Sequence, residues 1–312
     1  MRKIELFFGF LLLLSTVGIS AENQVSKIVE GKERCFPVVY PWDKGDGMRV
    51  QIGTDICSEE KSYLASREPF VKDSIKKLIS VSDGENVEKV PKIAFCMSGG
   101  GYRAMIGSLG FLLGAESIGL LGATSYIASL SGSSWLIGNL FTRMKKSNIT
   151  LQEFHKLLRD RLTKTKFLDV SSMQIDEIVK KITSVLLDRY KIEPIDLWGI
   201  LLIDRLLGDL PDAQNITFDE MRSCLAPGDR TPPFPLFSLV VSDVYPYEWL
   251  EVTPFVSGSD YLRAYVPTEA LDSIFKNGKR VKVMEQRSLG WFLGLFGSSY
   301  NASLGDVIVH IA

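Results

Sequence analysis

The sequence predicts an α/β fold in which a central mixed sheet has helices on both faces. Two short apolar segments, 92–97 and 124–128, are typical of buried strands. Each is followed by a turn of small residues and then by an apolar stretch expected to be helical. Further along, the apolar segments 237–241 and 248–252 predict two more strands. Strands and helices that alternate in this way indicate one sheet covered by helices.

Helices account for most of the remaining chain. A short helix is expected at 59–65, capped by Ser58, and a second helix is expected to begin at Pro69, which suits a first turn. Thr150 and Glu153 form a capping-box pattern at the start of a helix over 150–162. Three more helices are expected at 175–190, 194–207 and 218–224, and short strands near Val38 and Val50.

The first small-residue turn is a run of three glycines. It reads Ser98-Gly99-Gly100-Gly101-Tyr102-Arg103-Ala104 and precedes the helix expected at 104–118. Glycines permit a tight turn and close approach of another group to the backbone. The N-terminus of the helix would lie at these glycines, where free N–H groups and a partial positive charge favour an anion.

The second turn places a serine between a strand and a helix. Ser131 stands at the tip of Ser129-Leu130-Ser131-Gly132-Ser133, the context of a nucleophile elbow, although Ser129 replaces the first glycine of G-x-S-x-G. The glycine turn alone also fits a loose dinucleotide fingerprint, which requires an acidic residue at the end of the next strand. That strand ends in serines instead. The two turns together indicate an acyl-transfer site, with an oxyanion cradle beside a nucleophile, at one edge of the sheet.

These two motifs resemble a known family. Ser-Gly-Gly-Gly-Tyr-Arg-Ala, followed by Leu-Ser-Gly-Ser-Ser-Trp with Ser131 28 residues after Arg103, is similar to the catalytic domain of cytosolic phospholipase A2 and fungal phospholipase B, a lysophospholipase. Weaker similarity continues in Asp196-Leu197-Trp198-Gly199 and in the segments 235–237, 249–254 and 291–299. The resemblance implies a modified α/β-hydrolase-like fold and covers the chain from about residue 55 onward.

The resemblance also implies a reaction and a role for four residues. Ser131 would attack the acyl ester of a phospholipid or lysophospholipid presented by a membrane or micelle surface, as a step in phospholipid catabolism. Gly100 and Gly101 would donate their N–H groups to the oxyanion, and Arg103 would bind the lipid phosphate with its planar cationic fork. No cofactor or metal is expected, because the calcium-binding membrane module of the family is not matched.

The base that would activate Ser131 is not identified. The chain has two histidines, His155 and His310, and neither has the local signature of a triad. The family uses a Ser/Asp dyad whose aspartate follows the matched region. Three aspartates of the chain lie outside the corresponding context: Asp243, Asp272 and Asp306.

We therefore expect the sequence to be a C-terminally incomplete catalytic domain, or a truncated homologue without the base. Two alternatives stay open. One is an inactive secreted homologue that binds lipid. The other is a nucleotide-binding α/β protein.

The N-terminus predicts export. Arg2 and Lys3 precede an apolar run at 6–14, and Gly18 and Ser20 provide small residues for cleavage near Ala21. We expect a signal peptide at 1–21, an irregular and helical segment at 22–90, and the catalytic region at 91–312 with a helical insertion at 150–225. The protein would then be secreted or periplasmic, an environment that permits disulfides and, in eukaryotes, glycosylation of three sequons. These sequons are Asn148-Ile149-Thr150, Asn215-Ile216-Thr217 and Asn301-Ala302-Ser303.

Cysteine positions and overall charge add two expectations. Cys35 and Cys57 flank a loop and are the expected disulfide pair, whereas Cys96 is expected to be a buried free thiol in its strand. The 312 residues are 46% hydrophobic and 23% charged, as in ordinary globular proteins, and the net charge of −1 gives no indication of nucleic-acid binding. Composition does not predict an oligomeric state.

Overall fold

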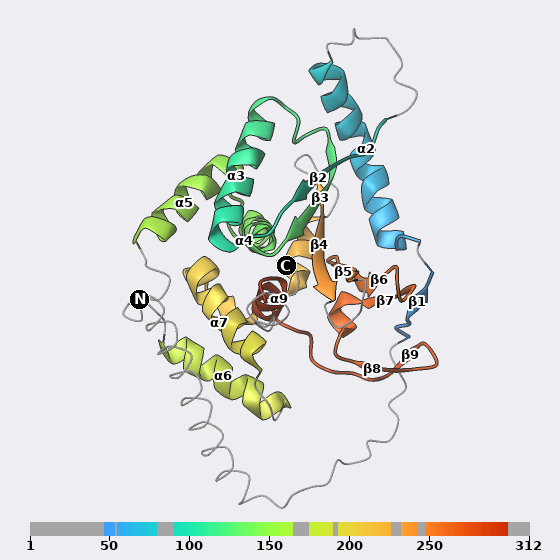
Figure 1. Ribbon diagram of the computed structural model, residues 1–312, viewed down its shortest axis with the longest axis vertical. Coiled ribbons are helices and arrows are strands. Elements are labelled where there is room, and N and C mark those ends of the chain that lie inside the picture. The colour runs from blue at the N-terminus through green and yellow to red at the C-terminus, as the bar shows by residue number, and fades with distance from the viewer. Residues whose placement is uncertain are drawn as a thin grey trace, which may run out of the picture.

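The fold is built on a seven-stranded mixed sheet (Figure 1). The computed structural model describes residues 47–53, 55–79, 90–164, 175–189, 193–225, 232–241 and 247–298. The strands lie in the spatial order β1 (Gln51–Ile52), β7 (Ala264–Pro267), β6 (Val256–Ser259), β5 (Glu248–Val252), β4 (Phe234–Val241), β3 (Thr124–Leu130) and β2 (Ile93–Met97). β2, β3 and β4 are parallel, and the other neighbours are antiparallel. β1 and β2 form the two edges, so the sheet is not closed into a barrel.

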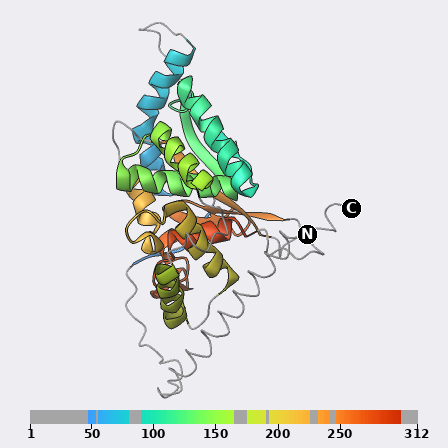
Figure 2. The ribbon, with the colours of Figure 1, turned by 90° about the vertical axis from the view of Figure 1, so that its left-hand side faces the viewer.

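Helices cover both faces of the parallel strands, as Figures 1 and 2 show. On one side lies α2 (Ser58–Leu78), and on the other lie α3 (Gly101–Ser117), α4 (Gly132–Ser147) and α9 (Leu289–Phe296). α5 (Leu151–Lys164), α6 (Ile175–Arg189), α7 (Pro194–Leu207) and α8 (Phe218–Cys224) lie between β3 and β4 in the sequence. The short strands β8 (Ile274–Lys276) and β9 (Lys279–Lys282) form a separate hairpin.

The main hydrophobic core lies between the sheet and the second helix layer. α4 is buried along most of its length, because β3, α3, α8 and α9 surround it. Phe237 of β4, Phe218 of α8 and Phe292 of α9 are each fully buried in this core and pack ring against ring. The α4 residues that follow Ser131 are thus part of the main hydrophobic core.

Most of the expected elements are confirmed. The strands expected at 92–97, 124–128 and 248–252 are β2, β3 and β5, and the helices at 194–207 and 218–224 are α7 and α8. The capping box at Thr150 is formed, because the side chains of Thr150 and Glu153 each bond the backbone N–H of the other. β4 begins at Phe234, three residues earlier than 237, because Phe234 and Pro235 pair with β3. The strand expected near Val50 is β1.

The expected break between two helices before Pro69 is wrong. α2 is one helix of 21 residues, with Pro69 inside it and Ser58 as its first residue rather than its cap. An internal proline removes one backbone hydrogen bond and costs about 3 kcal/mol or more. The helix is anchored on both sides of that position. The guanidinium of Arg67 donates to the Thr124 carbonyl at 3.0 and 2.8 Å, and Val71 and Ile75 are buried.

Cys96 is free, as expected, but it is exposed rather than buried. β2 is an edge strand, and its side chains alternate between a covered and an open face. Phe95 and Met97 point into the core, so Cys96 points outward. Cys57 has no disulfide partner among the described residues, and Cys35 lies outside them, so their pairing stays a prediction.

Other expectations concern residues that the structure does not describe. These are the signal segment, the strand near Val38, Asn301, His310 and the aspartates Asp243 and Asp306. Within the described ranges, every helix is too short or too polar to cross a membrane.

Candidate active site

The serine turn has the backbone geometry of a strained elbow. Ser131 lies between the last residue of β3 and the first residue of α4, with φ 55° and ψ −120°. An L-residue at such a positive φ costs about 1–3 kcal/mol and persists only where the surrounding structure imposes it. The Ser131 carbonyl accepts hydrogen bonds from the N–H groups of Ser134 and Trp135, at 2.8 and 3.2 Å. Helix formation therefore holds the strained turn in place.

The glycine loop, residues 98–101, packs directly against this turn. A Cβ atom built on Gly99 would lie 3.0 Å from the Cβ of Ser131. A Cβ built on Gly132 would lie 1.9 Å from the carbonyl oxygen of Gly101, so only glycine fits at position 132. The two turns meet because parallel β2 and β3 end at the same edge of the sheet, with Met97 beside Ser129. The expected meeting of the two motifs is confirmed.

The backbone of the loop requires glycine at the two positions expected to form the oxyanion hole. Gly100 has φ 135° and Gly101 has φ 60°, conformations that other residues rarely adopt. Gly100 is the N-cap of α3, as Ser131 is of α4; Gly100 has no side chain, and the Ser131 hydroxyl does not cap its helix. Two helices of 17 and 16 residues thus begin at the same place. Their partial positive charges favour a developing negative charge there.

Arg103 lies one residue from the glycine loop, on the first turn of α3. Its side chain is exposed and forms no hydrogen bond or ion pair with any other described residue. It lines a groove of about 730 Å³ that runs from Gly99 and Gly100 along β2 to Phe111. A cation near a helix N-terminus is unfavourable unless an anion binds there. The position of Arg103 is therefore suited to an anionic group in the groove.

No base accompanies the serine in the described part of the site. The hydroxyl of Ser131 makes no hydrogen bond to another described residue. The neighbouring groove, which Ser131 itself does not line, contains no histidine, carboxylate or lysine. Asp272 forms an ion pair with Arg287. His155 is half-buried on α5. The missing base stays unidentified.

Two aromatic residues that sequence reasoning did not assign support the site. The indole N–H of Trp135 donates to the Leu293 carbonyl of α9 at 2.9 Å, and its ring packs edge-on against Tyr102 at 5.8 Å. Burial raises the pKa of Tyr102, so its phenol stays neutral. A Cβ on Gly297 would lie 2.3 Å from the Trp135 ring. The sequence features that could have indicated this contact are Trp135, which ends the serine motif, and Gly297, which follows α9.

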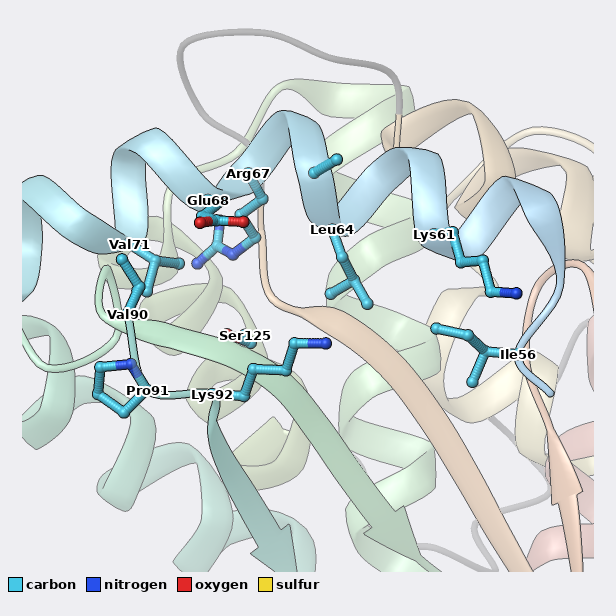
Figure 3. Close-up of a pocket in the computed structure, with 11 residues that line it drawn as sticks. Ile56, Lys61, Leu64, Arg67, Glu68, Val71, Val90, Pro91, Lys92 and Ser125 are labelled. Atoms are coloured by element: carbon cyan, nitrogen blue, oxygen red, sulfur yellow. The ribbon is translucent and has the colours of Figure 1, made fainter. Parts of the chain in front are cut away.

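The other cavities lie away from the serine turn. One, of about 220 Å³, lies under α2 and is lined by Lys61, Arg67 and Lys92 (Figure 3). Its most buried cation, Arg67, bonds main-chain carbonyls, so it has a structural role. Another, of about 340 Å³, contains Glu60 and Glu251 on the α2 face of the sheet. Across the described residues, no three histidine, cysteine or carboxylate side chains are grouped closely enough to hold a metal ion.

Comparison with known proteins identifies the family of the chain. The sequence pattern of the family described as "Lysophospholipase catalytic domain" matches residues 93–310. Cytosolic phospholipase A2 zeta of Mus musculus is 26% identical over 306 residues, which are 96% of this chain and 35% of that protein. Cytosolic phospholipase A2 gamma of Mus musculus is 30% identical over 265 residues, 80% of this chain and 41% of that protein. The chain thus spans between about a third and two fifths of the length of these relatives.

Solved structures show the same fold. Human GIVD cytosolic phospholipase A2 superposes with a TM-score of 0.71 at 23% identity, over 82% of this chain and 34% of that chain. The same human protein in complex with methyl gamma-linolenyl fluorophosphonate superposes with a TM-score of 0.68 at 24% identity, over 80% of this chain and 35% of that chain. At these identities the likeness establishes the architecture of the sheet and its helices.

Proposed function

Because the chain belongs to the lysophospholipase catalytic-domain family, we propose that it contributes the nucleophile and the oxyanion cradle to hydrolysis of glycerophospholipid acyl esters. The observation that carries the proposal is the position of Ser131. Its strained backbone sits at the N-terminus of α4, against the glycine loop. The catabolic role and the phospholipid or lysophospholipid substrate, presented by a membrane or micelle, belong to this proposal.

The proposed reaction uses the described residues in two steps. The oxygen of Ser131 attacks the ester carbonyl carbon, and the electron pair of the carbonyl moves to its oxygen, facing the N–H groups of Gly100 and Gly101. The carbonyl re-forms as the C–O bond to the glycerol alcohol breaks, and that alcohol takes up a proton. Water then cleaves the acyl-serine and releases a fatty acid. Arg103 binds the lipid phosphate.

The proton of the Ser131 hydroxyl must pass to a base, which the described groove does not contain. We therefore expect the 312-residue chain alone to turn over lysophospholipid slowly. A longer protein with the base should lose about a millionfold in turnover on Ser131→Ala, since serine and base act as a unit.

A radiolabelled lysophospholipid assay tests this proposal, with Ser131→Ala beside Ser134→Ala as a matched control. Ser134 is a fully buried serine three residues after the partly buried Ser131, and it bonds Ser129 on the strand side of the turn. Fatty-acid release that depends on Ser131 and survives Ser134→Ala supports the proposal. Release that is unchanged in Ser131→Ala contradicts it.

The second candidate is a secreted homologue that binds lipid without cleaving it. The groove beside Arg103 without a base favours this alternative. In that case lysophospholipid micelles bind equally to the wild type and to Ser131→Ala, and neither protein releases fatty acid. Arg103→Gln should weaken binding in either case, because it removes the cation from the groove.

We also propose that the chain is exported, with a mature N-terminus at Ala21 or Glu22. The charged, apolar and small-residue order of the first 20 residues supports it. N-terminal sequencing of protein from culture medium or periplasm tests this. An intact Met1 in cytosolic protein contradicts it.

A further inference from the structure

A fully buried hydroxyl connects the serine turn to the glycine loop. Ser133, in the first turn of α4, has 0% exposure. Its Oγ lies 2.5 Å from the carbonyl oxygen of Ser98 and 2.9 Å from the Oγ of Ser108 on α3. The Ser133 side chain therefore links α4 by hydrogen bonds to two other segments at the site, the glycine loop and α3.

The direction of both hydrogen bonds follows from the number of protons. A carbonyl oxygen can only accept, so the single proton of Ser133 goes to the Ser98 carbonyl. The Ser108 hydroxyl must then donate to Ser133. The result is a directed relay in which each bond polarises the next.

The relay fixes a peptide plane at the entrance of the glycine loop. The carbonyl of Ser98 belongs to the same planar group as the N–H of Gly99, and in a trans peptide the two point in opposite directions. Holding that carbonyl on α4 therefore also sets the direction of the Gly99 amide. The next two residues, Gly100 and Gly101, lack side chains that could hold them, and both have positive φ. A hydrogen bond from another segment therefore contributes strongly to fixing the backbone of this loop.

We infer that Ser133 is a positioning residue, which through the Ser108–Ser133–Ser98 relay holds the oxyanion amides of the glycine loop against Ser131. The inference rests on the proposed function for the meaning of that geometry. Ser133 itself does not touch the reacting atoms. Its removal should change the order of the loop and the rate of the chemical step, and should leave substrate binding unchanged.

A neighbouring serine supplies a matched control. Ser134 is also fully buried, and its Oγ donates to the Ser129 hydroxyl at 3.1 Å, which in turn donates to the Leu236 carbonyl at 3.3 Å. This second relay joins α4 to β3 and β4 on the other side of the turn. Ser134→Ala therefore removes the same group from the same helix turn without touching the glycine loop.

The first readout is backbone hydrogen exchange of a peptide that covers residues 98–104. One hydrogen bond contributes about a factor of five to a local equilibrium. We expect Ser133→Ala, which removes two bonds, to speed exchange about tenfold or more, and Ser108→Ala, at a half-buried site, about fivefold. Ser134→Ala should change it less than about twofold. Equal acceleration by Ser134→Ala, or no acceleration by Ser133→Ala and Ser108→Ala, overturns the inference.

The second readout separates positioning from packing. With a long-chain fluorophosphonate, the oxygen of Ser131 displaces fluoride from phosphorus and its proton passes to solvent. Ser108→Ala and Ser133→Ala should lower the maximal rate of phosphonylation about tenfold, with the probe concentration at half-maximal rate unchanged. A change confined to that concentration contradicts the inference. If the wild type itself does not react at Ser131, the proposed function fails, and the exchange contrast still decides the role of Ser133.

Discussion

Gly132→Ala tests the contact between the two turns more sharply than any other single change. The new Cβ would lie 1.9 Å from the Gly101 carbonyl oxygen and 2.6 Å from its carbon, whereas ordinary contact begins at 3.4 Å. Both atoms are backbone, so no side-chain rotation relieves the overlap. The glycine loop must therefore move away from Ser131 by roughly 1.5 Å, the difference between 3.4 and 1.9 Å.

Two effects oppose each other in the stability of this variant. Overpacking costs about 1–3 kcal/mol, while alanine in a helix gains up to about 1 kcal/mol over glycine. We expect a net loss of about 1–2 kcal/mol, which lowers the melting temperature by a few degrees in a chain of this size. Misplacement of reacting groups by about 1 Å costs on the order of a hundredfold in rate. Reactivity should thus fall far more than stability.

Gly110→Ala is the control. Gly110 lies on α3 with no atom within 4 Å of a built Cβ, so alanine there should stabilise by about 0.5–1 kcal/mol and leave reactivity unchanged. The assay combines thermal unfolding with the rate at which a fluorophosphonate modifies Ser131. The reasoning is refuted if Gly132→Ala melts at or above the wild-type temperature and reacts at the wild-type rate.

Three further changes probe other parts of the molecule. Burial, with the charges of Asp260 and Glu60 nearby, raises the pKa of Glu251. The Glu251 carboxyl therefore keeps its proton to higher pH in the folded protein than in the unfolded chain, so the free energy of unfolding should fall as pH rises above about 4.5. Glu251→Gln should reduce this loss in thermal melts run from pH 4 to 7. Arg143→Met should cost about 2–3 kcal/mol by urea unfolding, because the guanidinium is 1% exposed and its loss leaves the Asn139 side-chain oxygen and the Leu206 carbonyl without their donor. Asp209 is 39% exposed and keeps its ion pair with Arg161, and a loss below 1 kcal/mol contradicts the prediction. Arg103→Lys should leave stability unchanged and lower phospholipid turnover more than turnover of an uncharged ester, and equal effects on the two substrates argue against phosphate binding.

The parts of the fold that the sequence predicts are those with strong local signals. Reciprocal side-chain bonds at Thr150 and a proline at Pro194 mark the starts of α5 and α7, and both starts are placed within one residue. β2 and β3 are each followed by a turn that contains glycine, so once the two strands pair in parallel the turns meet at the same edge of the sheet.

Other parts depend on contacts that no local pattern reveals. Pro69 is read from the sequence as a helix start, whereas contacts on both sides of it, from Arg67 to β3 and from buried Val71 and Ile75, keep α2 continuous. The strands β6 and β7 are four residues each and carry no clear alternation, so they were not predicted. Cys96 faces outward because β2 is an edge, which is a property of the whole sheet.

The candidate site likewise has one part that local motifs predict and another that depends on contacts between residues distant in the sequence. Ser131, Gly100, Gly101 and Arg103 are found from two motifs, and the structure brings all four to one edge of the sheet. The role of Ser133 is not visible in the sequence, because its partners Ser98 and Ser108 lie 35 and 25 residues away.

The most direct measurement is a crystal structure of the chain after reaction with a long-chain fluorophosphonate. The account predicts phosphorus bonded to the oxygen of Ser131, with the phosphoryl oxygen about 3 Å from the amide nitrogens of Gly100 and Gly101. An adduct on another residue, or a phosphoryl oxygen turned away from the glycine loop, would contradict the assignment of this site.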